Sequence, residues 1–122
     1  MGIETVQRLG RGRGIRAVPA LDDYDARSEV WIEAEHRAEI ADSSALVGFW
    51  EGEPGWVRFE SWPYNEVCVI LSGRVAVEDE SGQRAVFGAG EAFVVPFGFQ
   101  GTWHTLEPTE KIFVGIESHA AK

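Results

Sequence analysis

Short apolar segments alternate with turn-forming residues over most of this sequence. From residue 45 onward, runs rich in Val, Ile, Phe and Trp are separated by clusters of Gly, Pro, Asp and Ser. This spacing is typical of short β-strands joined by tight turns. The strands that it predicts lie at residues 45–50, 56–62, 67–71, 74–78, 84–87, 92–95, 103–106 and 112–116. No stretch requires a long helix, so the pattern predicts an all-β sandwich or small barrel.

The segment at residues 29–40 carries two competing patterns. Its frequent Ala and Glu residues suit a helix. Its alternation of Val30, Ile32 and Ala34 with Trp31 and several glutamates suits an extended strand about as well. We interpret this segment as a strand.

The chain length and the weak pattern near the amino terminus set the domain organisation. A chain of 122 residues supports one domain with one core. Residues 1–28 show little periodicity and many Gly and Asp residues, so we expect an irregular lead-in that can add one short strand. The barrel is expected at residues 29–117, followed by a carboxyl-terminal tail at residues 118–122.

The charge of the chain is strongly negative and unevenly distributed. The net charge of −9 disfavours binding to nucleic acid duplexes or anionic membranes, since both require a basic surface. Residues 1–16 hold four arginines and one glutamate, a local charge of +3, which leaves −12 for the rest of the chain. The Gly-Arg-Gly-Arg-Gly stretch at residues 10–14 suits either an RNA-binding arm or a flexible or loosely docked segment. We favour the second interpretation and expect no nucleic acid or membrane partner.

Cysteine usage and hydropathy indicate a cytoplasmic protein. Cys68 is the only cysteine, so the chain can form neither an intrachain disulfide nor a zinc site with several cysteines. No apolar run approaches the ~20 residues that a membrane helix needs. Residues 1–20 also lack the apolar centre of a secretory signal. We therefore expect a protein of the reducing cytoplasm.

Acidic, glycine and proline residues recur at a spacing that points to a known fold. Glu66 is followed by six residues and then by Gly73, and later Gly90, Pro96 and Gly98 occur at the spacing of a second motif. These two segments resemble the paired motifs of the cupin superfamily. The resemblance implies a single-domain cupin jelly-roll barrel, also called a double-stranded β-helix. The glycines suit the hairpin corners of such a barrel, where the backbone adopts positive φ or approaches a neighbour closely.

Further residues resemble one branch of this superfamily. They are the segments Gly48–Glu51, Pro54–Gly55 and Gly101–Trp103, together with Lys111, and the resemblance covers residues 45–117. The branch contains cupins similar to the (S)-ureidoglycine aminohydrolase cupin domain, among them many short proteins of unknown function. Because members of this branch act in ureide and ethanolamine metabolism, the resemblance implies a small nitrogenous or carboxylated metabolite as ligand.

The metal site that the resemblance implies is largely missing. Metal-dependent cupins hold Mn, Fe, Zn or Ni with three histidines and a glutamate from the two motifs. Of these ligands only Glu66 is retained, and Gly101 stands where the second motif has its histidine. We therefore expect no metal cofactor. The alternative is an altered ligand set of Glu60, Glu66 and His104.

The resemblance also suggests which face of the strand at residues 56–62 points into the barrel. In the cupin register, Glu60 and Trp62 replace the two histidines of the first motif, and Arg58 lies on the same side. The opposite face is more apolar and equally able to point inward, and it carries Val57, Phe59 and Ser61.

The first register predicts a pocket with aromatic walls, carboxylates and cations. Its expected residues are Arg58, Glu60, Trp62, Glu66, Cys68, Trp103 and Lys111. Glu66 is the best catalytic candidate, since carboxylates in an apolar pocket can share proton-transfer work. The structural alternative is that Glu66 pairs with Arg58 or Lys111 to close the barrel end while aromatic side chains fill the core.

Two functions are compatible with these features. The first is a small-molecule-binding cupin, with or without enzymatic activity, that works without the usual metal. The second is a non-catalytic accessory or structural cupin with a filled barrel, in which strands near residues 30–40 extend a sheet between subunits. We favour the first function and expect a homodimer.

Overall fold

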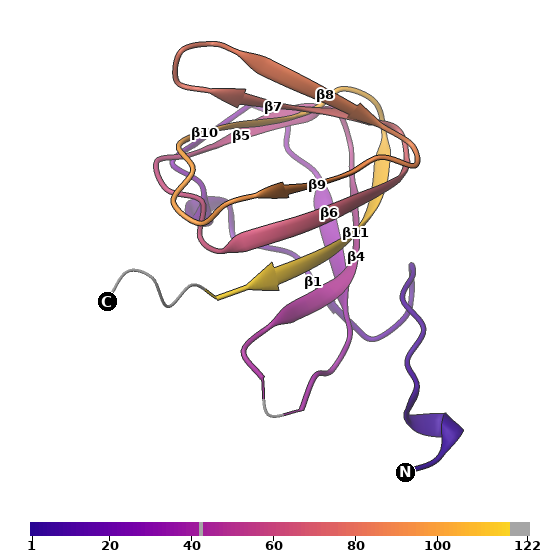
Figure 1. Cartoon of the computed structure of the whole chain (residues 1–122). Coiled ribbons are helices and arrows are strands. Elements are labelled where there is room, and N and C mark those ends of the chain that lie inside the picture. Colours follow the sequence, from indigo (N-terminus) through magenta and orange to yellow (C-terminus); the bar gives the residue numbers. More distant parts are fainter. Residues whose placement is uncertain (42, 118–122) are drawn as a thin grey trace.

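The computed structural model describes residues 1–41 and 43–117 and consists of two antiparallel β-sheets around a common core (Figure 1). The strands are β1 (Ile15–Ala17), β2 (Ala26–Arg27), β3 (Glu33–Arg37), β4 (Leu46–Gly52), β5 (Gly55–Phe59), β6 (Asn65–Ser72), β7 (Arg74–Asp79), β8 (Arg84–Gly88), β9 (Ala92–Val95), β10 (Gly101–Thr105) and β11 (Thr109–Ile116). Two short 3₁₀ turns, η1 (Ile3–Thr5) and η2 (Leu21–Asp23), lie in the amino-terminal segment. None of the described helices is long and apolar enough to cross a membrane. The tail expected at residues 118–122 lies outside the described residues.

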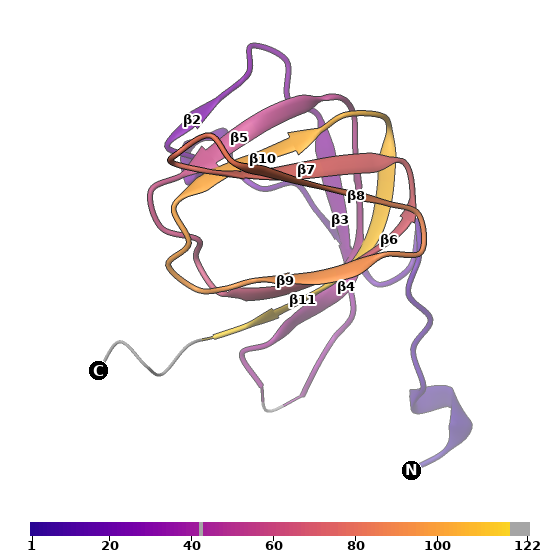
Figure 2. The same ribbon diagram turned by 45° about the horizontal axis from the view of Figure 1, so that its top comes forward.

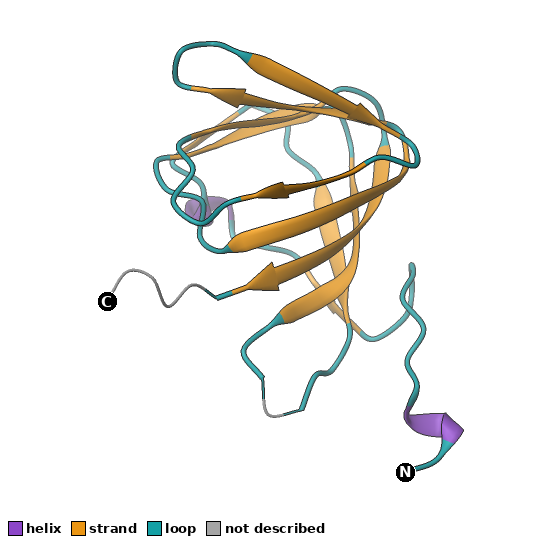
Figure 3. Cartoon of the chain, in the orientation of Figure 1, coloured by secondary structure: helices purple, strands orange, loops and turns teal. Residues whose placement is uncertain are grey.

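The two sheets face each other and are connected by repeated crossings of the chain. The larger sheet has the strand order β1-β3-β4-β11-β6-β9, and the smaller has the order β2-β5-β10-β7-β8. Figure 2 shows the two sheets on opposite sides of the interior, and Figure 3 shows strands joined almost entirely by loops. Because chain neighbours such as β4 and β5 lie in opposite sheets, the topology is that of a jelly roll. The predicted all-β jelly-roll barrel is confirmed.

Each strand predicted from residue 45 onward is present, with ends that differ by a few residues. The main difference is β5, which ends at Phe59 instead of reaching Trp62. A bend follows, and the Trp62 N–H donates to the Phe99 carbonyl at 2.8 Å while the Gly98 N–H donates to the Trp62 carbonyl at 2.9 Å. These bonds hold Trp62 against the loop after β9. The bend changes the alternation of faces, so Phe59 and Trp62 both point inward although they are three residues apart.

β3 confirms the strand interpretation for part of residues 29–40. Its inward face, however, carries glutamate side chains instead of apolar ones. Glu33 and Glu35 are buried, whereas Ile32 is 58% exposed. Hydropathy alone favours the opposite orientation. The pairing of β3 with β4 explains the result, because Glu35 lies directly opposite Trp50 and residues so paired share a face of the sheet. Trp50 belongs to the core, so Glu35 also faces inward.

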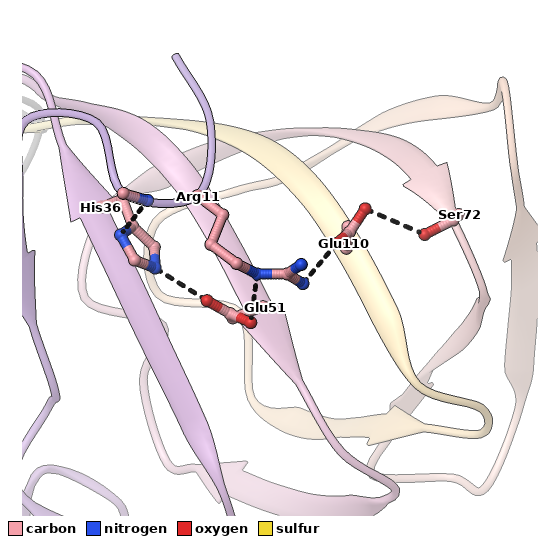
Figure 4. A network of polar contacts seen from close by, with 6 residues as sticks. Arg11, His36, Glu51, Ser72 and Glu110 are labelled. Atoms are coloured by element: carbon pink, nitrogen blue, oxygen red, sulfur yellow. Dashed lines mark hydrogen bonds and ion pairs between the residues drawn. The ribbon is translucent and has the colours of Figure 1, made fainter.

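Residues 10–17, which we call the strap, lie along the larger sheet: Ile15–Ala17 form its edge strand β1, and Arg11 contacts side chains on its outer face (Figure 4). The Arg11 guanidinium donates to Glu51 at 3.0 Å and also to Glu110. The Gly12 N–H donates to Nδ1 of His36 at 3.1 Å, and His36 Nε2 lies 2.7 Å from the Glu51 carboxylate. The Gly-Arg-Gly-Arg-Gly stretch is therefore docked on the barrel. The expectation that it has no nucleic acid partner stays a prediction.

Aromatic residues dominate the core between the sheets. Its buried members are Trp31, Trp50, Val57, Trp62, Cys68, Ile70, Val75, Val95, Trp103 and Phe113. Buried tryptophans contribute large apolar areas, but each also brings an indole N–H that needs an acceptor inside the barrel. No fully buried side-chain nitrogen or oxygen in the described part of the chain lacks a hydrogen-bond partner. The acceptors for these indoles are mostly carboxylates, and they define the candidate site.

Candidate functional site

A buried ion pair joins two neighbouring strands of the larger sheet. Lys111 on β11 places its Nζ 2.7 Å from Oε2 of Glu66 on β6, and both side chains are buried. The two-residue period of a strand turns Cys68 to the same side as Glu66, and its Sγ lies 3.4 Å from Glu66 Oε2. The indole N–H of Trp62 donates to Glu66 Oε1 at 3.0 Å. Both oxygens of this carboxylate therefore have partners, as a buried charge requires.

Aromatic rings enclose the ammonium group of Lys111. Its Nζ lies 3.9 Å from the ring centroid of Trp103 and 4.9 Å from that of Trp50. These cation–π contacts offset part of the free energy lost when the ammonium leaves water. Cys68 Sγ, at 3.6 Å, is a further contact of the same nitrogen. An ammonium group has only three N–H donors, so Lys111 has little capacity for another anionic partner.

The environment keeps both members of the pair charged. Burial by itself raises the pKa of Glu66, but the Lys111 charge and the hydrogen bonds from Lys111 and Trp62 outweigh it and hold that pKa below its usual range. Burial lowers the pKa of Lys111, and its contacts with Cys68 and Glu66 raise it by more. Burial also raises the pKa of the Cys68 thiol, which is therefore neutral at physiological pH. The pair is a fixed set of charges and not a proton-transfer couple.

A second buried carboxylate, Glu33 on β3, is held by neutral donors. The indole N–H groups of Trp31 and Trp50 donate to its two oxygens at 2.6 and 2.8 Å, and the Tyr24 hydroxyl donates to the same oxygen as Trp31. Burial raises the pKa of Tyr24, and the Glu33 charge raises it further, so the hydroxyl remains a donor. Three donors stabilise the Glu33 carboxylate. Within residues 1–41 and 43–117 it forms no ion pair, so its charge is not neutralised there.

A third carboxylate, Glu35, has one oxygen that is available for a further partner. The Arg37 guanidinium donates to Glu35 Oε1 at 2.7 Å. Glu35 Oε2 makes no hydrogen bond with the described residues, and because no fully buried oxygen there lacks a partner, Oε2 is open to the cavity. Burial raises the pKa of Glu35, and the Arg37 contact offsets only part of that effect. Glu35 is thus a partly paired carboxylate whose charge the fold stabilises poorly.

Two hollows adjoin each other at Glu35. The inner one, which we call the chamber, measures about 50 Å³ and reaches Glu66 and Lys111. The outer one, which we call the mouth, measures about 400 Å³ and is walled in part by residues of the amino-terminal segment. They share the lining residues Tyr24, Glu35, Phe59 and Tyr64. Since a water molecule occupies ~30 Å³ in the liquid, the chamber fits a head group of a few atoms and the mouth fits the rest of a small ligand.

The structure brings five predicted pocket residues together in the interior, namely Trp62, Glu66, Cys68, Trp103 and Lys111. Arg58 and Glu60 lie on the outer surface, so the expected orientation is wrong for these two. Arg58 stands between two inward-facing residues of β5 and must point outward, where it pairs with Glu60 and Glu80 at 2.7 Å each. Glu60 follows the end of β5, and its side chain is 60% exposed. Whether the interior residues bind a ligand stays a prediction.

Sequence reasoning missed one wall of the chamber. That wall consists of Tyr24, Trp31, Glu33, Glu35 and Trp50. The alternation Trp31, Glu33, Glu35 was a usable signal, because these three residues share one face of an extended chain. Glutamates on a strand usually mark its solvent-facing side. Here Trp31, two residues before Glu33, and Trp50 on the neighbouring strand β4 supply donors that keep the Glu33 carboxylate inside.

The interior does not fit the metal that the cupin resemblance implies. Glu66 is retained, but its oxygens are taken by Trp62 and Lys111, and the Lys111 charge repels a cation at this position. No group of three or more His, Cys, Asp or Glu in the part of the chain that the structure describes is arranged to hold a metal ion. The alternative metal ligands Glu60, Glu66 and His104 do not come together in the fold. Glu60 and His104 lie on the outside of the barrel, whereas Glu66 lies inside it.

The family of the chain follows from its match to a known domain. Residues 41–113, more than half of the chain, match the model of the EutQ-like cupin domain. The chain belongs to this family. The match covers Trp62, Glu66 and Lys111, whereas Glu33 and Glu35 precede it. The narrower resemblance to the (S)-ureidoglycine aminohydrolase branch stays a prediction.

Solved structures show the same fold as this EutQ-like cupin. A Salmonella typhimurium protein, provisionally named ethanolamine utilization protein Q, has a TM-score of 0.65 at 17% identity, with 93% of this chain and 94% of that chain covered. The EutQ protein of Clostridium difficile has a TM-score of 0.65 at 14% identity, with 77% and 69% covered. A DUF861 family protein from Thermotoga maritima has a TM-score of 0.51 at 33% identity, with 55% and 75% covered. No curated protein matches the chain significantly.

Proposed function

We propose that this EutQ-like cupin binds a small nitrogenous or carboxylated metabolite in the chamber and mouth, without the usual cupin metal. The observation that carries the proposal is that the two hollows share four lining residues, so the mouth adjoins the chamber that holds the buried carboxylates. Aromatic walls with a few convergent polar groups are typical of small-molecule sites. The resemblance to the (S)-ureidoglycine aminohydrolase branch supports a nitrogenous ligand.

A thermal-shift screen with two matched variants tests this proposal. Val57 lines the chamber and is buried, so Val57→Leu fills part of the space, whereas Val86→Leu makes the same change on an exposed side chain of β8. We expect metabolites that raise the melting temperature of the wild type to do so for Val86→Leu and not for Val57→Leu. Circular dichroism checks that Val57→Leu folds. The proposal is wrong if no metabolite in the screen binds, or if every hit binds Val57→Leu as well as the wild type.

The alternative function is a non-catalytic accessory cupin with a filled barrel. It is favoured by the small size of the chamber, where Trp50, Trp62, Trp103 and Lys111 leave only about 50 Å³. The mouth and the open oxygen of Glu35 argue for a binding site instead. Failure of the ligand screen would favour the accessory role.

We also propose a homodimer, for either function. Ile3 and Val6 of the amino-terminal segment are 84% and 69% exposed, and apolar side chains in such a segment are more stable when covered. A second copy of the chain offers an acidic surface to the basic residues 1–16. Light scattering during size-exclusion chromatography should give the dimer mass for the full chain and the monomer mass after deletion of residues 1–9. A monomeric full chain, or a dimer that survives the deletion, would contradict this arrangement.

A further inference from the structure

We propose that the ligand of the chamber is a compact organic ammonium ion, whose head group binds at Glu35 between the aromatic side chains of Tyr24, Phe59 and Tyr64. This inference rests on the proposed function, because it names the ligand class of the same site. It goes further by choosing the cation over the carboxylate. Four properties of the two hollows favour the cation: the charge of their lining, their free hydrogen-bonding groups, their aromatic side chains and their size.

The charge of the lining favours a cation. The chamber and mouth together are lined by five carboxylates and two cationic side chains, which are Asp23, Asp25, Glu33, Glu35, Glu66, Arg37 and Lys111. Five negative and two positive charges give a formal charge of −3 with all groups ionised. A cleft lined by charges of one sign raises the local concentration of ligands that carry the opposite charge. A carboxylated metabolite would meet repulsion here.

The available hydrogen-bonding groups also favour a cation. The Lys111 ammonium contacts Glu66, the Cys68 thiol and two indole rings, so it has little capacity left to bind an anion. Glu35 Oε2, in contrast, is an acceptor without a partner among the described residues and is open to the cavity. An ammonium N–H donated to this oxygen forms a charge-assisted hydrogen bond, which is among the stronger kinds. The site is therefore complementary to a donor cation.

Aromatic side chains surround the position next to Glu35. Tyr24 and Phe59 are 5.3 Å apart between ring centroids in an edge-to-face arrangement, and Phe59 and Trp62 are 4.7 Å apart. Tyr64 also lines both hollows. Aromatic rings of this kind recognise alkylammonium groups through their negative faces. The carboxylate and the rings together form one cation site.

The two volumes limit the shape of the ligand. The chamber of about 50 Å³ admits an ammonium head group but no bulky substituent. A short chain attached to that head group extends into the mouth, where Pro19, Leu46 and Pro63 provide apolar contacts. The expected ligand class is therefore a primary ammonium ion with a short, slender tail.

Nuclear magnetic resonance of the indole N–H groups gives a direct test. The probes are n-propylammonium, n-propanol and propionate, which share a three-carbon skeleton and differ in charge. The chain has five tryptophans, and the indoles of Trp31, Trp50 and Trp62 donate to chamber carboxylates, while Trp56 lines neither hollow. We expect n-propylammonium to shift the three chamber indole signals in a saturable way and to leave the Trp56 signal in place. The neutral and anionic probes should cause little shift.

Variants connect this binding to the named residues. Glu35→Gln keeps the shape and removes the charge, so the dissociation constant for n-propylammonium should rise at least ~10-fold, which corresponds to ~1.4 kcal/mol. Glu29→Gln is the matched control, because Glu29 is exposed and lines neither hollow. Tyr64→Leu removes one aromatic ring and should weaken binding at least ~3-fold. It provides an independent test if Glu35→Gln fails to fold.

The outcomes separate this inference from the proposed function. If propionate shifts the chamber indole signals and n-propylammonium does not, the ammonium class is wrong while small-molecule binding in the chamber stands. If n-propylammonium binds but Glu35→Gln and Tyr64→Leu have no effect, the site assignment is wrong. The inference fails if none of the probes shifts any chamber signal at concentrations up to ~50 mM, which is far above the dissociation constants typical of metabolites. The metabolite screen alone then decides the proposed function.

Discussion

Lys111 Nζ lies 2.7 Å from Glu66 Oε2 in the interior of the barrel, and the same nitrogen lies 3.9 Å from the Trp103 ring centroid. The two charged residues are 45 positions apart in sequence and become neighbours because β6 and β11 pair. A buried ion pair of this kind gives weak support to stability overall, but it becomes costly when one partner is removed. The pair therefore makes the interior sensitive to single substitutions.

Substitution of Lys111 should destabilise the fold strongly. Lys111→Met keeps most of the side-chain volume but leaves the Glu66 carboxylate buried without a cation, which should cost about 3–5 kcal/mol in the free energy of unfolding. Arg74→Met is the control, because it breaks an exposed pair with Glu107 at 3.7 Å and should cost about 1 kcal/mol or less. Urea denaturation at neutral pH measures both. Adding Glu66→Gln to Lys111→Met should recover part of the loss, and equal stability of Lys111→Met and the wild type would contradict the ion pair.

Substitution of Glu35 should change the pH dependence of stability. Burial raises the folded-state pKa of Glu35 above its unfolded value, which is near ~4.3. The stabilising contribution of its protonation is therefore fully present below about pH 4 and is lost as pH rises through the raised pKa. Glu35→Gln cannot titrate, so its stability relative to the wild type should increase as the pH rises from about 4 into the neutral range. Urea midpoints measured across this range check the sign, and a constant difference would contradict the raised pKa.

Two glycines of the strap offer a matched comparison. Gly12 and Gly14 both have positive φ, of +77° and +66°, but a Cβ on Gly14 would lie 2.0 Å from the Arg37 carbonyl oxygen, whereas none of the described atoms lies within 4 Å of a Cβ on Gly12. Gly12→Ala should cost about 1–2 kcal/mol for the left-handed backbone alone. Gly14→Ala should cost more and release the strap. Trypsin cleavage within residues 10–16 should therefore be faster in Gly14→Ala, and equal rates for the two variants would rule out the close approach to Arg37.

Cys68 should be unreactive in the folded protein. It is fully buried, and burial raises the pKa of its thiol, so neither access nor thiolate formation favours alkylation. Iodoacetamide should modify the protein at neutral pH only after unfolding, as followed by mass spectrometry with and without urea. Rapid modification of the native protein would show that the chamber opens as far as Cys68.

Much of the barrel could be predicted because its strands are short, apolar and bounded by glycines and prolines. β9 lies at its predicted residues, and β7 and β8 each differ by one residue. The same period-two reasoning places Glu66 and Cys68 on one face of β6, and both are buried. At residues 57–62 the alternation leaves two registers open. β5 follows the more apolar one, with Val57 and Phe59 inward and Arg58 outward, and the bend after Phe59 then turns Trp62 inward as well.

The sequence by itself determined the fold class, the family resemblance and the inward position of Glu66, Cys68 and Trp103 on β6 and β10, because side-chain alternation is a local property of an extended chain. Only the tertiary structure decided that Lys111 neutralises Glu66, since partners this far apart in sequence meet through sheet pairing. It also decided that Glu33 and Glu35 face the core, because the cost of burying a carboxylate depends on the donors and cations that other residues bring to it.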